Sequence, residues 1–329
     1  MLLIIDNSAN WSLPLGGSTR FAAIKGALAS VVNALSDATG NVNIGLMLYN
    51  EAGGIRLPGG APTGPNDGAY VRYALRSMSS ATNRSALVTL LNGLDATLDR
   101  GNAQQPALAL EEARRYIGGL ALLNGGNTSA KLDRQAIAAS GPAAYAPPLA
   151  ASCQRTIVVV ISNGPAAADD QTLAVPFVRA LNGGSTPAML PLPAPYPAPL
   201  LPATQSAATN WMDEYAALLR RAPYGAPAPS GSMDPSGILT YGIAVHDPAS
   251  SADNTNASAS GRALVLNASI QGGGKYFDAV DAAALAQSFG AILSEVQAAN
   301  SIFSSATLPF SATTPGTYLN QVYLGMVRP

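Results

Sequence analysis

Polar residues follow two apolar runs of strand length and precede one helical stretch, and they are the first place to look for chemistry. The run Leu2–Ile5 is followed by Asp6-Asn7-Ser8-Ala9-Asn10, the run 156–161 by Ser162-Asn163-Gly164, and the stretch that begins at Pro106 is preceded by Gln105. In an open α/β sheet the functional crevice lies beyond the carboxyl ends of the strands. We therefore expect these carboxylate, hydroxyl and amide groups to meet there and to hydrogen-bond across three loops.

Catalytic chemistry has few candidates in this sequence. The chain holds one histidine, His246, and one cysteine, Cys153, so any Ser/His or Cys/His arrangement would depend on them. No G-x-S-x-G elbow is present, and the glycines of 272–274 lack the spacing of a phosphate-binding loop. We interpret the glycine run as a turn and Cys153 as a free thiol. No catalytic residue is predicted, and the chain is not expected to be an enzyme.

The elements that must position the strand-end residues alternate along the chain. Apolar runs of strand length are separated by stretches of helical periodicity, as in βαβ units wound around a parallel sheet. The run 157–161 is apolar on both faces, which predicts a central strand covered by helices on each side. We predict an α/β fold with a doubly wound, mostly parallel sheet flanked by helices. The predicted strands are Leu2–Ile5, Ile44–Tyr49, Thr156–Ile161, Leu239–Val245 and Lys275–Phe277.

Helix signals and one hairpin complete the predicted sheet. The segments 54–57 and 70–75 are expected to pair as a hairpin at the sheet edge. Four stretches place leucine, isoleucine, valine and phenylalanine on one helical stripe, and each follows a capping residue or begins with proline. They begin near Ser18, after Ser85, at Pro106 and near Asp281, and the third ends at Gly118-Gly119.

Several stretches interrupt the α/β pattern. The segment 183–208 contains PLPAPYPAPLLP and predicts an extended surface connector, and 222–236 is a second Pro/Gly/Ser loop. The segment 247–260 is expected to be a polar loop. We assign residues 1–300 to one domain that carries the proline-rich insertions, and residues 301–329 to a β extension that leads to a missing downstream domain.

The order of these motifs resembles the von Willebrand factor A fold. The segment C-Q-R-T-I-V-V-V-I-S-N-G-P (153–165) is similar to the central strand and the turn of that family. The segments G-G-G-K-Y-F-D-A (272–279) and Y-L-N-Q-V-Y (318–323), separated by a helix, resemble the PilC/PilY type IV pilus tip-associated adhesins in particular. This resemblance implies a von Willebrand factor A-like, Rossmann-type layered domain in the N-terminal region of such an adhesin.

The same resemblance implies a metal-ion-dependent adhesion site, in which D-x-S-x-S, a Thr and an Asp hold Mg²⁺. Mapped onto this chain, Asp6 and Ser8 keep the pattern, whereas Asn10 replaces a Ser, Gln105 the Thr and Asn163 the Asp. Mg²⁺ prefers oxygen ligands in an octahedron and carboxylate charge around it, and this set supplies only one carboxylate. We therefore expect a degenerate site that binds no cofactor tightly, with weak Mg²⁺ or Ca²⁺ occupancy and a hydrogen-bonded polar cluster as the alternatives.

Composition limits the partners of the chain. The chain has 329 residues, 48% of them apolar, and its 18 Lys and Arg nearly balance its 19 Asp and Glu. This balance provides no field that would attract nucleic acid or an anionic membrane, and no apolar run approaches the roughly 20 residues of a membrane span. Only 11% of the residues are charged. That composition favours a secreted or surface-assembled protein.

Composition and resemblance together predict an extracellular module at the cell surface or pilus tip (fimbrium) that binds a host or abiotic surface. The alternative is a structural adaptor that docks on minor pilins or other tip subunits, and primes or caps the pilus without binding a target itself. The segment MLLIID reads as a buried strand rather than a signal peptide. Because such a protein must be exported, we expect a signal peptide ahead of Met1 in its precursor.

Overall fold

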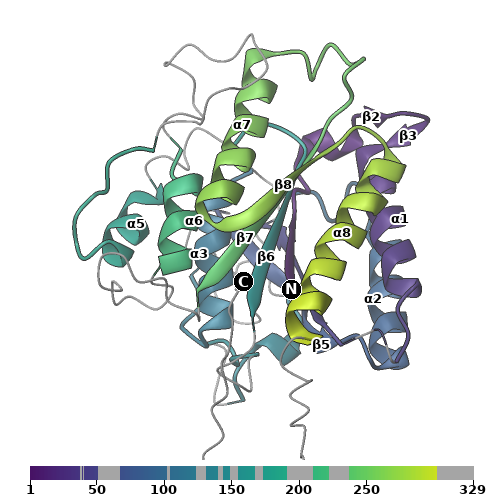
Figure 1. Ribbon diagram of the computed structural model, residues 1–329, viewed down its shortest axis with the longest axis horizontal. Helices are drawn as coiled ribbons and strands as arrows, with labels where there is room; N and C mark the ends of the chain where they lie inside the picture. The colour runs from purple at the N-terminus through teal and green to yellow at the C-terminus, as the bar shows by residue number, and fades with distance from the viewer. Residues whose placement is uncertain are drawn as a thin grey trace, which may run out of the picture.

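A sheet with helices on both faces forms the centre of the molecule (Figure 1). The computed structural model describes residues 1–37, 39, 41–50, 67–101, 104–123, 131–139, 144–148, 155–166, 173–190, 210–221 and 237–301. Within these ranges the strands are β1 (Leu2–Ile5), β2 (Pro14–Leu15), β3 (Ser18–Thr19), β4 (Asn43–Tyr49), β5 (Ala69–Ser77), β6 (Thr156–Ser162), β7 (Ile238–Val245) and β8 (Gly273–Ala279). The α-helices are α1 (Arg20–Asn33), α2 (Ala81–Gly93), α3 (Pro106–Ile117), α5 (Val175–Leu181), α6 (Met212–Arg221), α7 (Asn256–Gln271) and α8 (Ala282–Ser301); the 3-10 helices are η1 (Ala9–Ser12) and η2 (Arg134–Ala136).

The main sheet has the order β5-β4-β1-β6-β7-β8 in the described residues. Strand β1 pairs in parallel with β4 and β6, and β7 pairs in parallel with β6 and β8. Strand β5 is antiparallel to β4 at one edge, so the 70–75 half of the predicted hairpin pairs with β4, while its predicted partner 54–57 lies outside the described residues. The doubly wound, mostly parallel α/β fold, the five predicted strands and the central place of β6 are confirmed. The carboxyl ends of five strands consequently meet at one end of the sheet.

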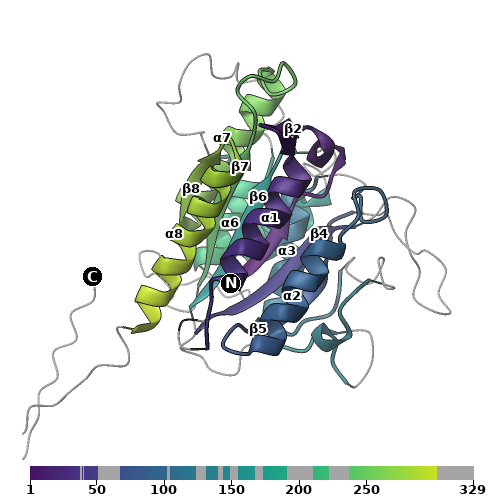
Figure 2. The same ribbon diagram turned by 90° about the vertical axis from the view of Figure 1, so that its right-hand side faces the viewer.

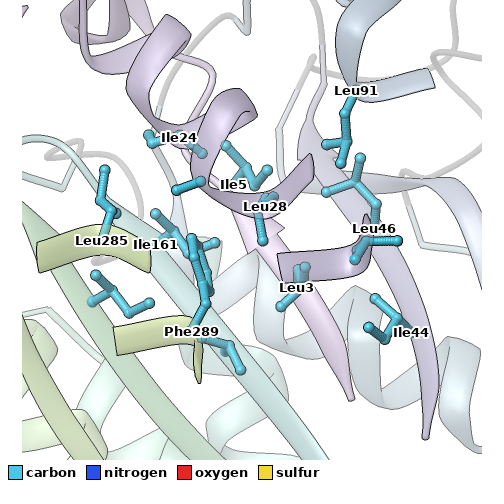
Figure 3. Close-up of a cluster of buried hydrophobic side chains, with 14 of the residues drawn as sticks. Leu3, Ile5, Ile24, Leu28, Ile44, Leu46, Leu91, Ile161, Leu285 and Phe289 are labelled. Carbon is cyan, nitrogen blue, oxygen red and sulfur yellow. The ribbon is translucent and has the colours of Figure 1, made fainter. Parts of the chain in front are cut away.

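Two apolar cores lie on opposite faces of the sheet. Successive side chains of a strand point to opposite faces, and β1 shows the division: Leu3 and Ile5 belong to one core, Leu2 and Ile4 to the other. Helices α1, α2 and α8 cover the first face, and α3, α6 and α7 cover the second (Figures 1 and 2). Figure 3 shows the first core, where side chains of α1, α2 and α8 meet those of β1, β4 and β6.

The helix starts that we predicted from capping residues need correction in two places. Helix α1 is capped by Thr19, whose side chain accepts from the N–H of Ala22 at 3.2 Å, whereas Ser18 lies in β3. Helix α2 begins at Ala81 with Ser80 as its cap, ahead of the predicted start after Ser85. Its first turn is polar, so the apolar stripe begins one turn after the helix does. Helix α3 begins and ends as predicted.

The prediction of a polar loop over 247–260 is wrong at its end, because α7 begins at Asn256. The side chain of Thr255 caps this helix by accepting from the N–H of Ser258 at 3.1 Å. Helix α7 packs closely on β7: a Cβ on Gly242 would lie 2.5 Å from Cγ1 of Val265. Such close packing requires small residues, and small residues give little amphipathic signal.

Some predicted features lie outside the described residues. These are the 54–57 half of the hairpin, Cys153, most of the 183–208 connector, the 222–236 loop and the extension that follows Ser301. None of the helices in the described part is long and apolar enough to cross a membrane.

Candidate functional site

Asp6 joins the ends of β1 and β6. Its Oδ1 accepts from the N–H of Ser8 at 2.9 Å, and its Oδ2 accepts from the N–H of Asn163 at 3.0 Å. The Asn163 side chain donates back to the Asp6 carbonyl at 2.7 Å. Burial raises the pKa of the Asp6 carboxyl, while hydrogen bonds from Ser8 and Asn163 and the charge of Arg20 act to lower it. Three predicted site residues, Asp6, Ser8 and Asn163, are therefore in direct contact.

Asn7 joins the same end of β1 to its other neighbour, β4. Its side chain donates to the carbonyls of Tyr49 and Asp99 at 3.1 and 2.7 Å, and accepts from the N–H of Tyr49 at 2.8 Å. The Asn7 carbonyl accepts from the N–H of Gly101 at 2.8 Å. Asn7 belongs to the strand-end motif of the sequence, but nothing in the sequence indicated its role. The amide supplies both donors and an acceptor, which fits a position between two strands and a loop.

Asn10 lies in η1 and packs against the turn that follows β6. A Cβ on Gly164 would lie 2.1 Å from Nδ2 of Asn10, so any larger residue there would displace the Asn10 amide. The turn is further fixed by Ser162, whose hydroxyl donates to the Gly164 carbonyl at 3.0 Å and accepts from Nε2 of Gln104 at 2.6 Å. Asn10 thus reaches the cluster through packing, and Gln104 is a contributor that sequence reasoning missed.

Gln105 forms hydrogen bonds with the two residues that directly precede β5. Its Nε2 donates to Oδ1 of Asp67 at 2.7 Å, and its Oε1 accepts from the N–H of Gly68 at 2.7 Å. Gly68 has φ 76°, in the left-handed region that favours glycine. The hydrogen bonds of the Gln105 amide described here therefore support the β4–β5 side of the strand ends, rather than Asp6.

A buried ion pair completes the site on the β7 side. Arg20, the first residue of α1, donates through Nη1 to the carbonyl of Asn163 and pairs through Nη2 with Asp253. Both side chains are buried, and Oδ2 of Asp253 also accepts from the N–H of Asp247 at 2.7 Å. Sequence reasoning missed this pair. The one available signal was an arginine at the start of a helix, where the helix dipole disfavours a cation.

The donor set does not fit a tightly bound divalent cation. Both carboxylate oxygens of Asp6 accept main-chain N–H groups, and the carbonyl oxygen of Gln105 accepts from Gly68. The guanidinium of Arg20 brings a positive charge to the same strand ends, where Mg²⁺ would need negative charge around it. In the described part of the chain, His, Cys, Asp and Glu nowhere gather in a group of three or more that could hold a metal ion.

The groups that we weighed for catalysis lie in ordinary surroundings. Nδ1 of His246 is 3.0 Å from Oδ1 of Asp278, so the imidazole faces the end of β8. The predicted turn is confined to Gly272, which caps α7, because Gly273 and Gly274 already belong to β8; Gly273 has φ 71°. A Cβ on Gly273 would lie 2.6 Å from Nε of Arg220, so the side chain of α6 covers the glycine.

Comparisons with known proteins give distant structural similarities. No protein-family model matches the sequence, and no curated protein sequence matches it. Similar solved structures include a mutant of the PilB minor pilin from Streptococcus sanguinis (13% identity, TM-score 0.49, 92% of this chain and 62% of that chain). Others are the pilus adhesin SpaC from Lactobacillus rhamnosus GG (13%, 0.44, 90% and 30%) and a von Willebrand factor type A protein from Catenulispora acidiphila (12%, 0.40, 90% and 42%). This chain spans less than two thirds of each of the three.

Proposed function

We propose that this chain is an extracellular binding domain of a type IV pilus tip-associated adhesin that resembles the PilC/PilY family. In this proposal it acts by display and binding, with no catalytic residue and no tightly bound metal ion. The sequence resemblance supports the family, and the mixed α/β sheet supports the domain type. The observation that carries the binding role is the construction of the strand-end face, where buried side chains tie the loops to one another.

Side-chain hydrogen bonds and an ion pair, and not only the covalent chain, hold the loops at the strand ends in place. Asn7 fixes the loop before α3 through Asp99 and Gly101, and Arg20 fixes the loop after β7 through Asp253. Loops carried on a rigid scaffold are favoured binding elements, because little conformational entropy is lost when they meet a partner. The face is therefore suited to recognition of a surface.

The loop that Asn7 holds presents an apolar side chain to solvent. Oδ1 of Asp95 accepts the N–H groups of Thr97 and Leu98, both at 2.8 Å, and Trp11 donates to the carbonyl of Ala96 at 3.2 Å. The Leu98 side chain is nevertheless 71% exposed. Because the backbone around Leu98 is already fixed, little conformational entropy is lost when this exposed leucine contacts a partner.

Three exposed residues allow a matched test of this face. Leu98→Arg and Ala249→Arg place a charge on the strand-end loops, and Ile270→Arg places the same charge near the other end of α7. We expect the first two variants to bind host cells or an abiotic surface at least about tenfold more weakly, and Ile270→Arg to bind as the unmodified protein does. Equal binding by all three variants would contradict the proposed face.

The same proteins separate adhesion from the adaptor alternative. An adaptor would bind purified minor pilins and no host or abiotic surface, and the two strand-end variants would then weaken pilin binding. Retention of the protein on a surface in the absence of pilins supports the adhesin role. Binding to neither class of partner, by a folded protein, would refute the proposed function.

A further inference from the structure

Arg20 is an unfavourable residue for its position unless its surroundings compensate for it. It is the first residue of α1, and its side chain is 0% exposed. The N-terminus of a helix carries partial positive charge, which disfavours a cation there. Removal of an ionised group from water is costly unless the group is paired and hydrogen-bonded. The groups that surround Arg20 must therefore supply this compensation.

The compensation comes from the strand-end residues themselves. Arg20 binds the carbonyl of Asn163 and the carboxylate of Asp253, which is 2% exposed. The N–H of Asn163 donates in turn to Asp6 at 3.0 Å, and the N–H of Asp247 donates to Asp253 at 2.7 Å. One continuous chain of polar contacts therefore connects the ends of β1 and β6, the start of α1 and the loop after β7.

A divalent cation in a crevice of this kind would draw strands and loops together through oxygen ligands. Here a guanidinium with several donors joins oxygen acceptors from the same region. We propose that Arg20 is the permanent cation of the strand-end crevice, built into the chain, so that the loops are held without a metal ion. The consequence that a partner is bound without a metal ion rests on the proposed function, whereas the role of Arg20 stands on the geometry alone.

Close packing around Arg20 leaves little room for a metal ion, and the guanidinium of Arg262 also lies at this place, where its Nη1 donates to the Asp253 carbonyl at 3.2 Å. A Cβ on Gly261 of α7 would lie 2.6 Å from the carbonyl oxygen of Gly164, so the helix touches the turn after β6. The hollow beside Asn163, His246, Asp253 and Arg262 has a volume of about 10 Å³. A cavity of that size has room for roughly one water molecule.

The loss of the Arg20 charge should turn the crevice into a cation site. Oδ1 of Asn163 is buried and has no hydrogen-bond partner in the described residues. In a variant with a neutral side chain at position 20, Asp253 loses its ionic partner and Asp6 loses a nearby positive charge, so two carboxylates and an amide oxygen lie at the same strand ends without it. Each carboxylate oxygen that already accepts an N–H group can still accept a further contact. Two carboxylates and an amide are suitable ligands for Mg²⁺ or Ca²⁺. A purely structural ion pair would predict only lost stability, with no gain of cation binding.

Thermal unfolding of the full chain in EDTA, in Mg²⁺ and in Ca²⁺ separates the two interpretations. A ligand at about 5 mM with a Kd of about 50 µM raises the stability of the state that binds it enough to shift the melting temperature by several degrees. We expect no cation response from the unmodified protein. We expect Arg20→Gln to melt roughly 10 °C lower in EDTA, because one partner of a buried pair is lost, and to recover part of that loss in Mg²⁺ or Ca²⁺.

Two further variants make the response specific. Arg20→Lys keeps a positive charge, so it should be weakened yet indifferent to cations. Arg76→Gln removes an arginine from a second ion pair, with Asp133 beside β5, and should lose stability without any rescue.

The proposal is overturned by a cation response of the unmodified protein, or by an Arg20→Gln variant that folds and responds no more than Arg76→Gln does. If Arg20→Gln does not fold in any buffer, Arg20→Lys decides. A lysine variant that folds where the glutamine variant does not, and that ignores cations, shows that position 20 must carry a positive charge and supports the proposal; one that responds to cations, or does not fold, refutes it. Because these readouts involve no partner, they are independent of the binding tests for the proposed function.

Discussion

The buried carboxyl of Asp213 lies between α6 and α7, and its substitution measures how strongly this contact depends on pH. The residue is 2% exposed, and Nδ2 of Asn267 donates to its Oδ2. Burial, first, and the neighbouring Glu214 carboxyl raise the pKa of Asp213 from its ordinary 3.8 to about 9. The group therefore holds its proton in the folded protein at neutral pH and loses it when the chain unfolds.

The sign of the effect follows from this difference. The folded state binds the proton more tightly than the unfolded state, so the contribution of Asp213 to stability is complete below about pH 4 and is lost as the pH rises toward 9. Neutral pH lies about 3 units above the unfolded pKa, and each unit corresponds to about 1.4 kcal/mol, so the loss at pH 7 is about 4 kcal/mol. Asp213→Asn keeps the shape and the donor but cannot ionise. We expect it to be more stable than the unmodified protein by about 4 kcal/mol at pH 7 and by only about 1 kcal/mol near pH 4.5.

Urea unfolding of both proteins between about pH 4.5 and about pH 8 tests this expectation, because the difference between the two curves isolates the substituted group. Asp37→Asn is the matched control: its side chain is 79% exposed and pairs with Arg84 at the surface. We expect the control to change stability by less than about 0.5 kcal/mol at every pH. Parallel curves for Asp213→Asn and the unmodified protein, or an Asp213→Asn variant that is the less stable at pH 8, would refute the reasoning.

Two other substitutions test the packing at the strand ends. Asn7→Ala leaves the N–H and carbonyl of Tyr49 and the carbonyl of Asp99 without their side-chain partner. We expect the free energy of unfolding, measured by urea titration, to fall by about 3 kcal/mol. A loss below about 1 kcal/mol would contradict the role given to Asn7. Gly261→Ala should destabilise the protein by about 1–3 kcal/mol, because its Cβ would meet the Gly164 carbonyl at 2.6 Å. The control is Gly290→Ala in α8, whose Cβ would have no atom within 4 Å and which should stabilise the protein by about 0.5–1 kcal/mol. Equal effects at the two glycines would show that α7 can move away from the turn after β6.

The strands were predictable because burial on both faces of the sheet requires apolar residues at successive positions. A parallel strand covered on both faces is apolar throughout, so Leu2–Ile5 and 156–161 stand out as short continuous runs. Helix α7 shows no such continuous apolar pattern in the sequence. It lies so close to β7 that its buried positions include Ala263, Ala268 and Ser269 alongside Leu264, and the apolar stripe is diluted by small residues.

The site was predictable in its place but not in its contacts. The rule that strand ends form the crevice brought Asp6, Ser8 and Asn163 together, because parallel strands fix where those residues lie. The partner of Arg20 is 233 positions away in the chain, in a loop whose path depends on the tertiary fold. No periodicity or spacing connects residues that distant. The hydrogen bonds of Gln105 to Asp67 are hidden for the same reason.

Arg20 also changes what the departures from the family pattern mean. Considered alone, Asn10, Gln105 and Asn163 are three weakened ligands of a metal ion. In the folded chain, the side-chain amide of Asn163 donates to the Asp6 carbonyl, Gln105 holds the start of β5, and Asn10 packs against the turn after β6. Each has a function that a Ser, Thr or Asp would not fill, and the positive charge is already provided. A return to the family ligands at these three positions would place a new carboxylate close to Asp6, yet the guanidinium would still balance part of that charge. Recovery of a metal site therefore requires that Arg20 be neutralised as well, which makes the arginine, rather than the three amides, the residue that separates this crevice from a metal-dependent one.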